Sequence, residues 1–449
     1  RQNWLWQRDE VPPALALSQN DPVSVPQDSR FPRETDDDWY RDAAHSGFLD
    51  ALARLDGVPT ARRRRVRVAQ LDTGYDPGHQ ALPVGIDRTL ARNFVAGEDL
   101  HDASDQVDGP LTNRGHGTGT LGILAGRDPA DPTRTIGGAP FVEIVPIRVA
   151  DRVVLFSNSA IARALDYVFS LKDDPEKRID IVTMSMGGLP SQAWADAVNA
   201  LYDAGIFVVT AAGNNYGNAP TRNIVFPARF NRVVAACGVM ADGSPYADLP
   251  GTLMAGNYGP ASKMRTAIAA ATPNLPWARI GAPTVVDHDG SGTSSATPQV
   301  AAAAAIWLAD SAHSAELPED WRRVEAIRYA LFASARGGAN PKLGRGTLDA
   351  VGMAAQSVPL AELEQEKPDT ASFAFLRALL GVGLTDPSDD PTYAMLSLEA
   401  LQLSLHPVIE AILPDLDADP DQLAAATRQR LAATLATDAR ASMTLRQWL

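Results

Sequence analysis

The sequence predicts an α/β fold in which a parallel β-sheet is flanked by helices, followed by a small C-terminal module that is all α-helical. Near-continuous apolar strands separated by helices are typical of a parallel sheet covered on both faces. The strand candidates are residues 66–71, 142–149, 179–184, 206–211 and 233–239, and the intervening helical segments are residues 117–125, 158–171 and 192–204.

The composition excludes several classes of partner and site. The 449 residues suffice for one large domain and a smaller one, and 45% hydrophobic with 21% charged residues is ordinary for a soluble globular protein. The net charge of -14 argues against a nucleic-acid partner, because phosphate binding needs clustered Lys and Arg. Cys237 is the only cysteine, so an internal disulfide and a Cys-based metal site are excluded, and we interpret it as a small buried hydrophobe. No apolar run has membrane-spanning length.

The N-terminal part has three segments. Residues 1–37 are rich in Pro, Asp and Gln and predict an extended arm. Either Trp4 and Trp6 bind the arm to a groove, or the arm is a disordered tail in which the two tryptophans occur by chance. Residues 38–55 predict a helix. The four arginines at 62–65 form either a processing site or, the favoured interpretation, a solvated strand entrance.

Three polar residues stand where ligands of a parallel sheet bind, just after strands or at the start of a helix. Asp72 ends the first strand, Asn214 follows the fourth, and His116 opens a helix between two glycines. Each has a structural alternative: a loop cap, a structural histidine and a turn residue.

Ser294 completes the set. It lies among small residues (289–298) at the mouth of an Ala-rich helix through residues 301–308. Unpaired N–H donors and the positive end of the dipole at a helix N-terminus can stabilise an oxyanion beside such a serine. The alternative is a simple helix cap.

In the chain order Asp72, His116, Asn214, Ser294, these residues follow the order of the subtilisin group. Residues 292–298, Gly-Thr-Ser-Ser-Ala-Thr-Pro, resemble the Gly-Thr-Ser-x-Ala-x-Pro motif of subtilisin-like serine proteases (subtilases, peptidase family S8), and the resemblance extends over residues 38–356. It implies that Ser294 is the nucleophile, His116 the general base and then acid, and Asp72 the residue that orients it. Asn214 and the Ser294 amide would receive the oxyanion.

The resemblance also implies a substrate site. Residues 185–188, Ser-Met-Gly-Gly, look like the strand edge along which subtilases bind an extended protein or peptide substrate. The two walls of the primary pocket would be Ser185, Met186 and Gly187, and Ala211, Ala212 and Gly213, with Val225 at the base. A valine where glycine is common makes the pocket shallow and suited to small or medium apolar side chains.

Two departures from the family pattern matter. Gly119 stands where the family often has a second histidine, three residues after the catalytic one. Residues 79–82, His-Gln-Ala-Leu, replace the His-Pro-Asp-Leu run that carries a calcium ligand, which argues against the usual calcium site. No cofactor is expected and no metal ligand is assigned. Calcium at Asp102, Asp105 and Asp108 is the alternative, although acidic loops are usually solvated.

The composition shifts after residue 355. Residues 357–370 predict a linker, and residues 371–449 predict an α-helical module with helical blocks at 371–382, 393–405, 407–413, 421–437 and 442–449. The module either docks a protein partner or packs on the first domain as an extension.

Two other functions compete with a serine endopeptidase. A peptide-binding pseudoprotease would act through the helical module. A sedolisin-type acid peptidase would need Glu at 116 and Asp at 214, which the sequence lacks.

A bacterial cytoplasmic location is favoured, because no signal peptide is visible and one cysteine is present. Secretion after processing upstream of Arg1 is the alternative.

Overall fold

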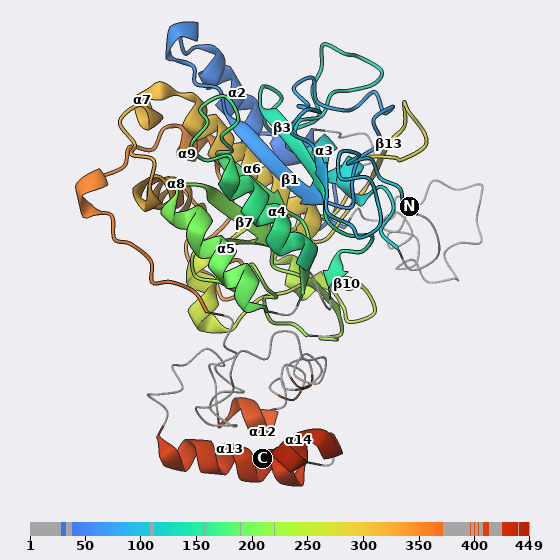
Figure 1. Ribbon diagram of the computed structural model, residues 1–449, viewed down its shortest axis with the longest axis vertical. Coiled ribbons are helices and arrows are strands. Elements are labelled where there is room, and N and C mark those ends of the chain that lie inside the picture. Colours follow the sequence, from blue (N-terminus) through green and yellow to red (C-terminus); the bar gives the residue numbers. More distant parts are fainter. Residues whose placement is uncertain are drawn as a thin grey trace.

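A parallel sheet of seven strands forms the centre of the molecule, in the order β11-β9-β7-β5-β1-β3-β2 (Figure 1). This computed structural model describes residues 28–32, 38–107, 112–155, 159–188, 190–219 and 221–370, and parts of the C-terminal region (396, 399, 403, 407–412, 424–438 and 440–448). The strands are β1 (Arg67–Asp72), β2 (Arg92–Asn93), β3 (Glu143–Arg148), β5 (Ile181–Met184), β7 (Phe207–Ala211), β9 (Val234–Val239) and β11 (Ala267–Ala271). All neighbours pair in parallel, which confirms the predicted fold class.

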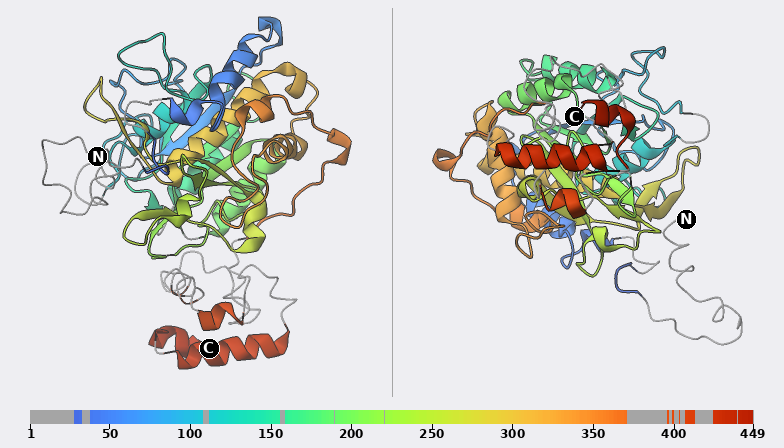
Figure 2. Two further views of the ribbon diagram at one scale, coloured as in Figure 1. Left: turned by 180° about the vertical axis from the view of Figure 1, so that it is seen from behind. Right: turned by 90° about the horizontal axis from the view of Figure 1, so that it is seen from below.

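Helices cover both faces of this sheet, and alternate strand residues supply the two cores. Val68 and Val209 pack on the face lined by α6, whereas Ala69 and Val208 pack on the opposite face. Helices α4 (Ser159–Ser170) and α5 (Gln192–Asp203) lie side by side on that opposite face, in front of the sheet in Figure 1. The α6 side, seen from behind in Figure 2, carries α2 (Phe48–Asp56), α3 (His116–Ala125), α6 (Thr293–Ala309), α8 (Trp321–Ala333) and α9 (Ala350–Ala354).

Helix α6 is the central helix of the molecule, because all of its residues are buried. It contacts β5, β7, β9 and β11 as well as the surrounding helices. Alanine favours the helix and, with only a methyl group, lets the backbone lie close to the strands. The predicted segment 301–308 is therefore the second half of a longer helix whose first turn holds Ser294.

The helix predicted over residues 38–55 is wrong in its first half. Only a 3-10 turn forms at Trp39–Arg41, and α2 begins at Phe48. The Asp42 carboxylate accepts hydrogen bonds from the amides of Ala44 and His45, and Gly47 adopts a left-handed conformation with φ of 69°. Both features break a helix before residue 48.

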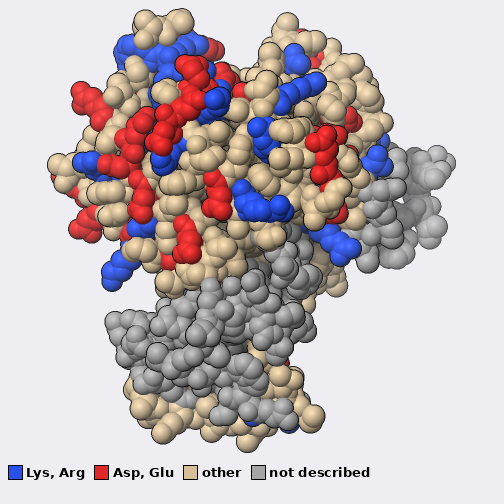
Figure 3. Space-filling model, in the orientation of Figure 1, with Lys and Arg blue, Asp and Glu red and all other residues tan. Residues whose placement is uncertain are grey.

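The four arginines at 62–65 lead into β1, and each forms an ion pair. Their partners are Asp310, Asp56, Asp180 and Glu176, at 3.0, 3.4, 2.7 and 3.1 Å respectively. Basic and acidic side chains are likewise interspersed over the face shown in Figure 3. This arrangement fits the strand-entrance interpretation of the arginine run.

The described part of the N-terminal arm is short. Phe31 is buried with Met240, Tyr246 and Leu249, while Trp4 and Trp6 lie outside the described residues. Over the described stretches of the chain, no helix is both long and apolar enough to cross a bilayer.

The C-terminal region contains α12 (Pro407–Glu410), α13 (Ala425–Thr437) and α14 (Met443–Trp448). Leu431 and Leu435 of α13 are buried, as their helical spacing predicts. The predicted block 371–382 lies outside the described residues, and only residues 396, 399 and 403 of the block 393–405 are described, all of them helical.

Residues 360–370 are an ordered strap along the first domain. Asp369 accepts hydrogen bonds from the amides of Asn231 and Arg232 at 2.7 and 2.9 Å, and the Glu366 carbonyl accepts from the Arg232 guanidinium. Asp369 is only 5% exposed, so the predicted linker has a buried anchor at its end.

Candidate active site

Asp72 is the last residue of β1 and is 1% exposed. Its Oδ1 accepts a hydrogen bond from the Thr73 amide at 2.7 Å and lies 2.7 Å from His116 Nδ1. Its Oδ2 accepts one from Thr120 Oγ1 at 3.1 Å. Donors therefore fix both oxygens of a buried carboxylate, as a buried charge requires.

His116 is the first residue of α3, and glycines let the helix start against the end of β1. Gly115 before it is left-handed, with φ of 82°. A Cβ at residue 117 would lie 2.0 Å from the Gly74 carbonyl oxygen, so only glycine fits there. The two glycines that flank His116 thus bring α3 onto the turn after Asp72.

Ser294 lies in the first turn of α6 and is 6% exposed. Its Oγ donates a hydrogen bond to the Ser185 carbonyl at 3.1 Å, and Ser185 Oγ donates to the Ser294 carbonyl at 2.9 Å. Within the described part of the chain, His116 Nε2 has no hydrogen-bond partner. The structure thus joins Asp72 to His116 and Ser294 to Ser185, but does not join the serine to the histidine.

Asn214 contacts the same helix start from the other side, at the beginning of β8 (Asn214–Tyr216). Its Oδ1 accepts a hydrogen bond from the Thr293 amide at 2.9 Å. A Cβ on Gly292, which has φ of 76°, would lie 2.9 Å from Asn214 Nδ2. The amide group is therefore oriented by its oxygen, with its donor nitrogen beside the turn that leads to Ser294.

The proposed substrate edge is already paired in part. Residues Gly187–Gly188 form β6, which runs parallel to β4 (Val154–Leu155). The Gly187 amide donates to the Val153 carbonyl at 3.1 Å, and the Gly188 amide donates to the Phe226 carbonyl at 2.8 Å. An extended substrate that uses the Gly187 amide has to replace the hydrogen bond to Val153.

Val225 lies between the two predicted pocket walls. Its Cγ2 would be 2.5 Å from a Cβ at residue 187 and 3.0 Å from one at residue 213. Its amide donates to the Ala212 carbonyl at 3.0 Å. Of the other predicted lining residues, Met186 and Ala211 are 2% and 3% exposed, so their side chains belong to the core.

Sequence reasoning missed Trp277, on β12 (Leu275–Ala278), which lies against the catalytic-histidine candidate. Its ring meets the His116 ring edge to face, with 5.6 Å between centroids. A Cβ on Gly119 would lie 1.9 Å from Trp277 Cε2. The glycine that replaces the family's second histidine therefore makes room for this indole, and that departure was the available signal.

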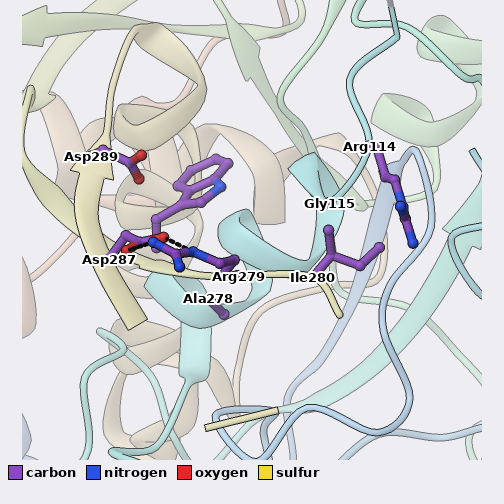
Figure 4. Close-up of a pocket in the computed structure, with 8 residues that line it drawn as sticks. Arg114, Gly115, Ala278, Arg279, Ile280, Asp287 and Asp289 are labelled. Atoms are coloured by element: carbon purple, nitrogen blue, oxygen red, sulfur yellow. Dashed lines mark hydrogen bonds and ion pairs between the residues drawn. The ribbon is translucent and has the colours of Figure 1, made fainter. Parts of the chain in front are cut away.

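Trp277 also lines an open pocket of about 410 Å³ beside His116. Figure 4 shows Asp287 and Asp289 on one side of this pocket and Arg114 on the other, with Arg279 ion-paired to Asp287. The remaining lining residues are Gly115, Ala278 and Ile280. Opposite charges line the pocket, so it is polar but has no strong net charge.

Two regions of the chain are candidates for metal binding. His79 accepts a hydrogen bond from the Ala81 amide and contacts the Val285 carbonyl, so both ring nitrogens are engaged. In the acidic loop, Asp102 is exposed, Asp105 is half-buried and Asp108 lies outside the described residues. Among the residues that are described, no cluster of three His, Cys, Asp or Glu side chains could hold a metal ion.

Cys237 is buried as predicted. Burial raises the pKa of its thiol to about 12, so it stays protonated and behaves as a small hydrophobe.

Comparison with known proteins identifies the family. The model of the subtilase family matches residues 63–353. The chain is similar to subtilisin DY of Bacillus licheniformis, with 32% identity over 175 residues, which are 39% of this chain and 56% of that protein. It is 28% identical over 250 residues to thermitase of Thermoactinomyces vulgaris, covering 56% of this chain and 76% of that one. It is 27% identical over 180 residues to the major intracellular serine protease of Bacillus subtilis (strain 168), covering 39% and 51%.

The chain thus spans little more than half the length of two of these three relatives. The family model, by contrast, covers well over half of this chain and includes Asp72, His116, Asn214 and Ser294. The protein, with its parallel seven-stranded sheet, belongs to the subtilase family.

Proposed function

We propose that the protein is a serine endopeptidase that hydrolyses peptide bonds through Asp72, His116 and Ser294. The observation that carries this proposal is the 2.7 Å contact between the buried Asp72 carboxylate and His116 Nδ1. A carboxylate on Nδ1 fixes the tautomer in which Nε2 is free to accept a proton. Nε2 is buried and has no partner within the described residues, so it is available for that role.

In the reaction, Ser294 Oγ attacks the substrate carbonyl carbon while His116 Nε2 takes the hydroxyl proton. The imidazolium then gives this proton to the leaving amine, and water repeats the sequence to release the acyl group. Before it attacks, Ser294 Oγ has to leave the Ser185 carbonyl and donate to His116 Nε2 instead. Catalytic hydrogen bonds are often unformed before substrate binds.

Asn214 and the backbone amide of Ser294 receive the oxyanion. Asn214 Oδ1 is held by the Thr293 amide, so Nδ2 is the group left to donate. The Ser294 amide belongs to the first turn of α6, where N–H groups have no acceptor within the helix. Donors placed before the charge develops contribute roughly 3–4 kcal/mol each to the transition state.

The substrate binds as an extended strand along residues 185–187, and the Val153 carbonyl gives up its hydrogen bond from the Gly187 amide as it does so. The primary pocket is shallow, because Val225 fills the space between Gly187 and Gly213. We therefore expect cleavage after small or medium apolar side chains. A pseudoprotease acting through the C-terminal helices is not favoured, since all four catalytic positions carry the required residue types.

Labelling with a fluorophosphonate probe tests the activity. We expect one adduct, on Ser294, together with hydrolysis of an unstructured protein such as casein. Ser294→Ala should lose both. Ser295→Ala is the matched control, because Ser295 Oγ bonds the Ser291 carbonyl and takes no part in the reaction, so it should keep both. An unlabelled wild-type protein, or an undiminished adduct on Ser294→Ala, would contradict the proposal.

A peptide-library cleavage profile tests the pocket. The wild type should prefer Ala, Val or Leu on the acyl side, and Val225→Gly should extend the preference to aromatic residues. A profile dominated by Arg or Lys would overturn the shallow apolar pocket and leave the serine mechanism standing.

A further inference from the structure

The acidic loop that the sequence offered as a calcium alternative packs on the turn after Asp72. The Asp105 amide donates to the Tyr75 carbonyl at 2.8 Å, and the Tyr75 amide donates to the Ala103 carbonyl at 3.3 Å. A Cβ on Gly74, which has φ of 103°, would lie 2.8 Å from Asp105 Cα. The loop and the turn are therefore in direct backbone contact.

The Asp105 carboxylate bonds to residues on both sides of the acid–base pair. Its Oδ2 accepts a hydrogen bond from the Gly115 amide at 2.6 Å and one from Thr73 Oγ1 at 3.3 Å. Gly115 is the residue before His116, and Thr73 is the residue after Asp72. Its Oδ1 accepts from the Val107 amide at 2.9 Å, which holds the carboxylate to its own loop.

A second contact connects the same two segments. Thr73 Oγ1, which donates to Asp105, also accepts a hydrogen bond from the Gly117 amide at 3.3 Å. Arg148, which is fully buried, donates to the Thr73 carbonyl and is ion-paired to Glu98 at 2.8 Å. Thr73 is thus hydrogen-bonded to both Arg148 and Asp105. Of these two residues, only Asp105 also bonds to Gly115, the residue that precedes His116.

We propose that Asp105 is a positioning residue: through one carboxylate oxygen it holds the Asp72 turn and the start of the His116 helix at the spacing that catalysis needs. This inference rests on the proposed serine endopeptidase function. Asp105 does not reach the reacting atoms; it acts through Thr73 and Gly115. A misplacement of about 1 Å at a catalytic group can lower the rate on the order of 10²-fold.

The ionisation of Asp105 provides a second readout. Burial raises the pKa of its carboxyl above the ordinary aspartate value, although the Gly115 and Val107 amides and the Arg148 charge act in the opposite direction. Below that pKa, the carboxyl carries a proton where it has to accept hydrogen bonds. Positioning is therefore lost as the pH falls.

Other titratable and charged groups face Asp105. They come from every element packed against the loop: Asp72, Tyr75 and Asp76 from β1 and its turn, Arg148 from β3, Arg114 and His116 from the entrance to α3, and Asp102 from the loop itself. Only a break that disappears when Asp105 is replaced can be assigned to Asp105.

The test compares Asp105→Asn and Asp105→Ala with Asp102→Asn, the matched control. Asp102 lies on the same loop but is exposed, and its oxygens bond to the Ser104 amide and Gln106. Steady-state rates on a chromogenic peptide are divided by the concentration of sites titrated with a fluorophosphonate. We expect kcat per titrated site to fall about 10- to 100-fold in the Asp105 variants, with KM nearly unchanged, as for a displaced catalytic group.

The pH profile of kcat/KM is measured on the same proteins. The wild type and Asp102→Asn should show a break on the acidic side of the profile that Asp105→Asn lacks. If Asp105→Ala folds poorly, Asp105→Asn and Thr73→Val are compared instead. Thr73→Val removes one of the two hydrogen bonds to Asp105 Oδ2. Thr73→Val should lower kcat less than Asp105→Asn does.

Two results separate the possible failures. If the wild type is labelled at Ser294 and active, but the Asp105 variants keep wild-type kcat per titrated site and the acidic break, Asp105 is merely structural and this inference is wrong. A fall in the titratable fraction or the melting temperature alone leads to the same conclusion. If the wild type is neither labelled nor active, the proposed function fails, and the role of Asp105 fails with it.

Discussion

The acid–base half and the nucleophile half of the site are held in different ways. Asp72 receives hydrogen bonds on both oxygens and lies 2.7 Å from His116. Ser294, by contrast, donates to the Ser185 carbonyl, and His116 Nε2 has no partner within the described residues. The fold therefore joins Asp72 to His116 but does not join Ser294 to His116.

This difference follows from where the residues lie. Asp72 and His116 belong to β1 and α3, which lie in close contact because Gly117 packs against the Gly74 carbonyl and Thr120 donates to Asp72. Ser294 lies on α6 and donates to the carbonyl of Ser185, the residue at the start of the proposed substrate edge. In the proposed mechanism, folding therefore fixes the orientation of the base, and substrate binding completes the nucleophile. Substitutions in the Asp72–His116 half and in the Ser294 half should therefore change activity and stability in different ways and by different amounts.

Asp72→Asn should have the largest effect. An asparagine can present an N–H to His116 Nδ1, which favours the wrong tautomer. A loss of about 10⁴-fold in kcat is the magnitude known for this change in a serine protease triad. Steady-state kinetics with active-site titration measure it, and a loss below tenfold would show that the acid–base half is not set by this carboxylate.

Asn214→Ala should lower kcat about 10²- to 10³-fold with little change in KM, a magnitude established for an oxyanion donor in a member of this same family. Asn215→Ala is the matched control. Asn215 Nδ2 donates to Asn257 Oδ1 at 2.9 Å inside the core, so this variant should lower the melting temperature but keep kcat per titrated site. Equal losses of kcat in both variants would contradict a specific role for Asn214.

Gly119→Ala should destabilise the fold, because the new methyl group would overlap the Trp277 ring. Overpacking of this kind costs about 1–3 kcal/mol in the free energy of unfolding. Gly122→Ala on the same helix is the control, since its Cβ would find its nearest neighbour at 3.7 Å. Urea unfolding of both variants decides the matter, and equal stability would show that the indole moves aside freely.

Thr120→Val should have the smallest effect. It removes one hydrogen bond to Asp72 Oδ2 and leaves the bonds to Oδ1 in place. The loss of one bond to a charged group is worth at least about 1.5 kcal/mol, roughly a tenfold fall in kcat/KM. Thr118→Val is the comparison, because Thr118 Oγ1 accepts from the Asp76 amide rather than donating to Asp72. A larger effect of Thr118→Val would mean that the turn, rather than the carboxylate, limits the rate.

The sheet core could be predicted from the sequence because its five central strands are apolar and long enough to recognise. The two edge strands could not. β2 has only two residues, and β11, Ala267–Ala271, is so rich in alanine that its composition favours a helix as much as a strand. Tertiary pairing with β3 and β9 decides both.

The candidate site was predictable as a set of residues but not as a set of contacts. Short motifs identify Asp72, His116, Asn214 and Ser294 as candidates, since each residue follows a strand or lies at the start of a helix. Trp277 and Asp105 carry no motif. Trp277 packs against Gly119, which the sequence marks only as a departure from the family pattern, and Asp105 packs against Gly74 in the turn after Asp72. The Val153–Gly187 hydrogen bond joins two segments far apart in the chain, which residue patterns cannot indicate.

The buried anchor at Asp369 determines where the catalytic part of the chain can be cut for separate study. The family match ends at residue 353, yet the Tyr202 hydroxyl accepts a hydrogen bond from the Glu366 amide at 2.8 Å and donates one to Glu325 at 2.7 Å. A truncation at residue 356 would leave the amides of Asn231 and Arg232 and the Arg232 guanidinium without their acceptors in the strap. The strap is therefore part of the packed domain, and an expression boundary belongs after residue 370.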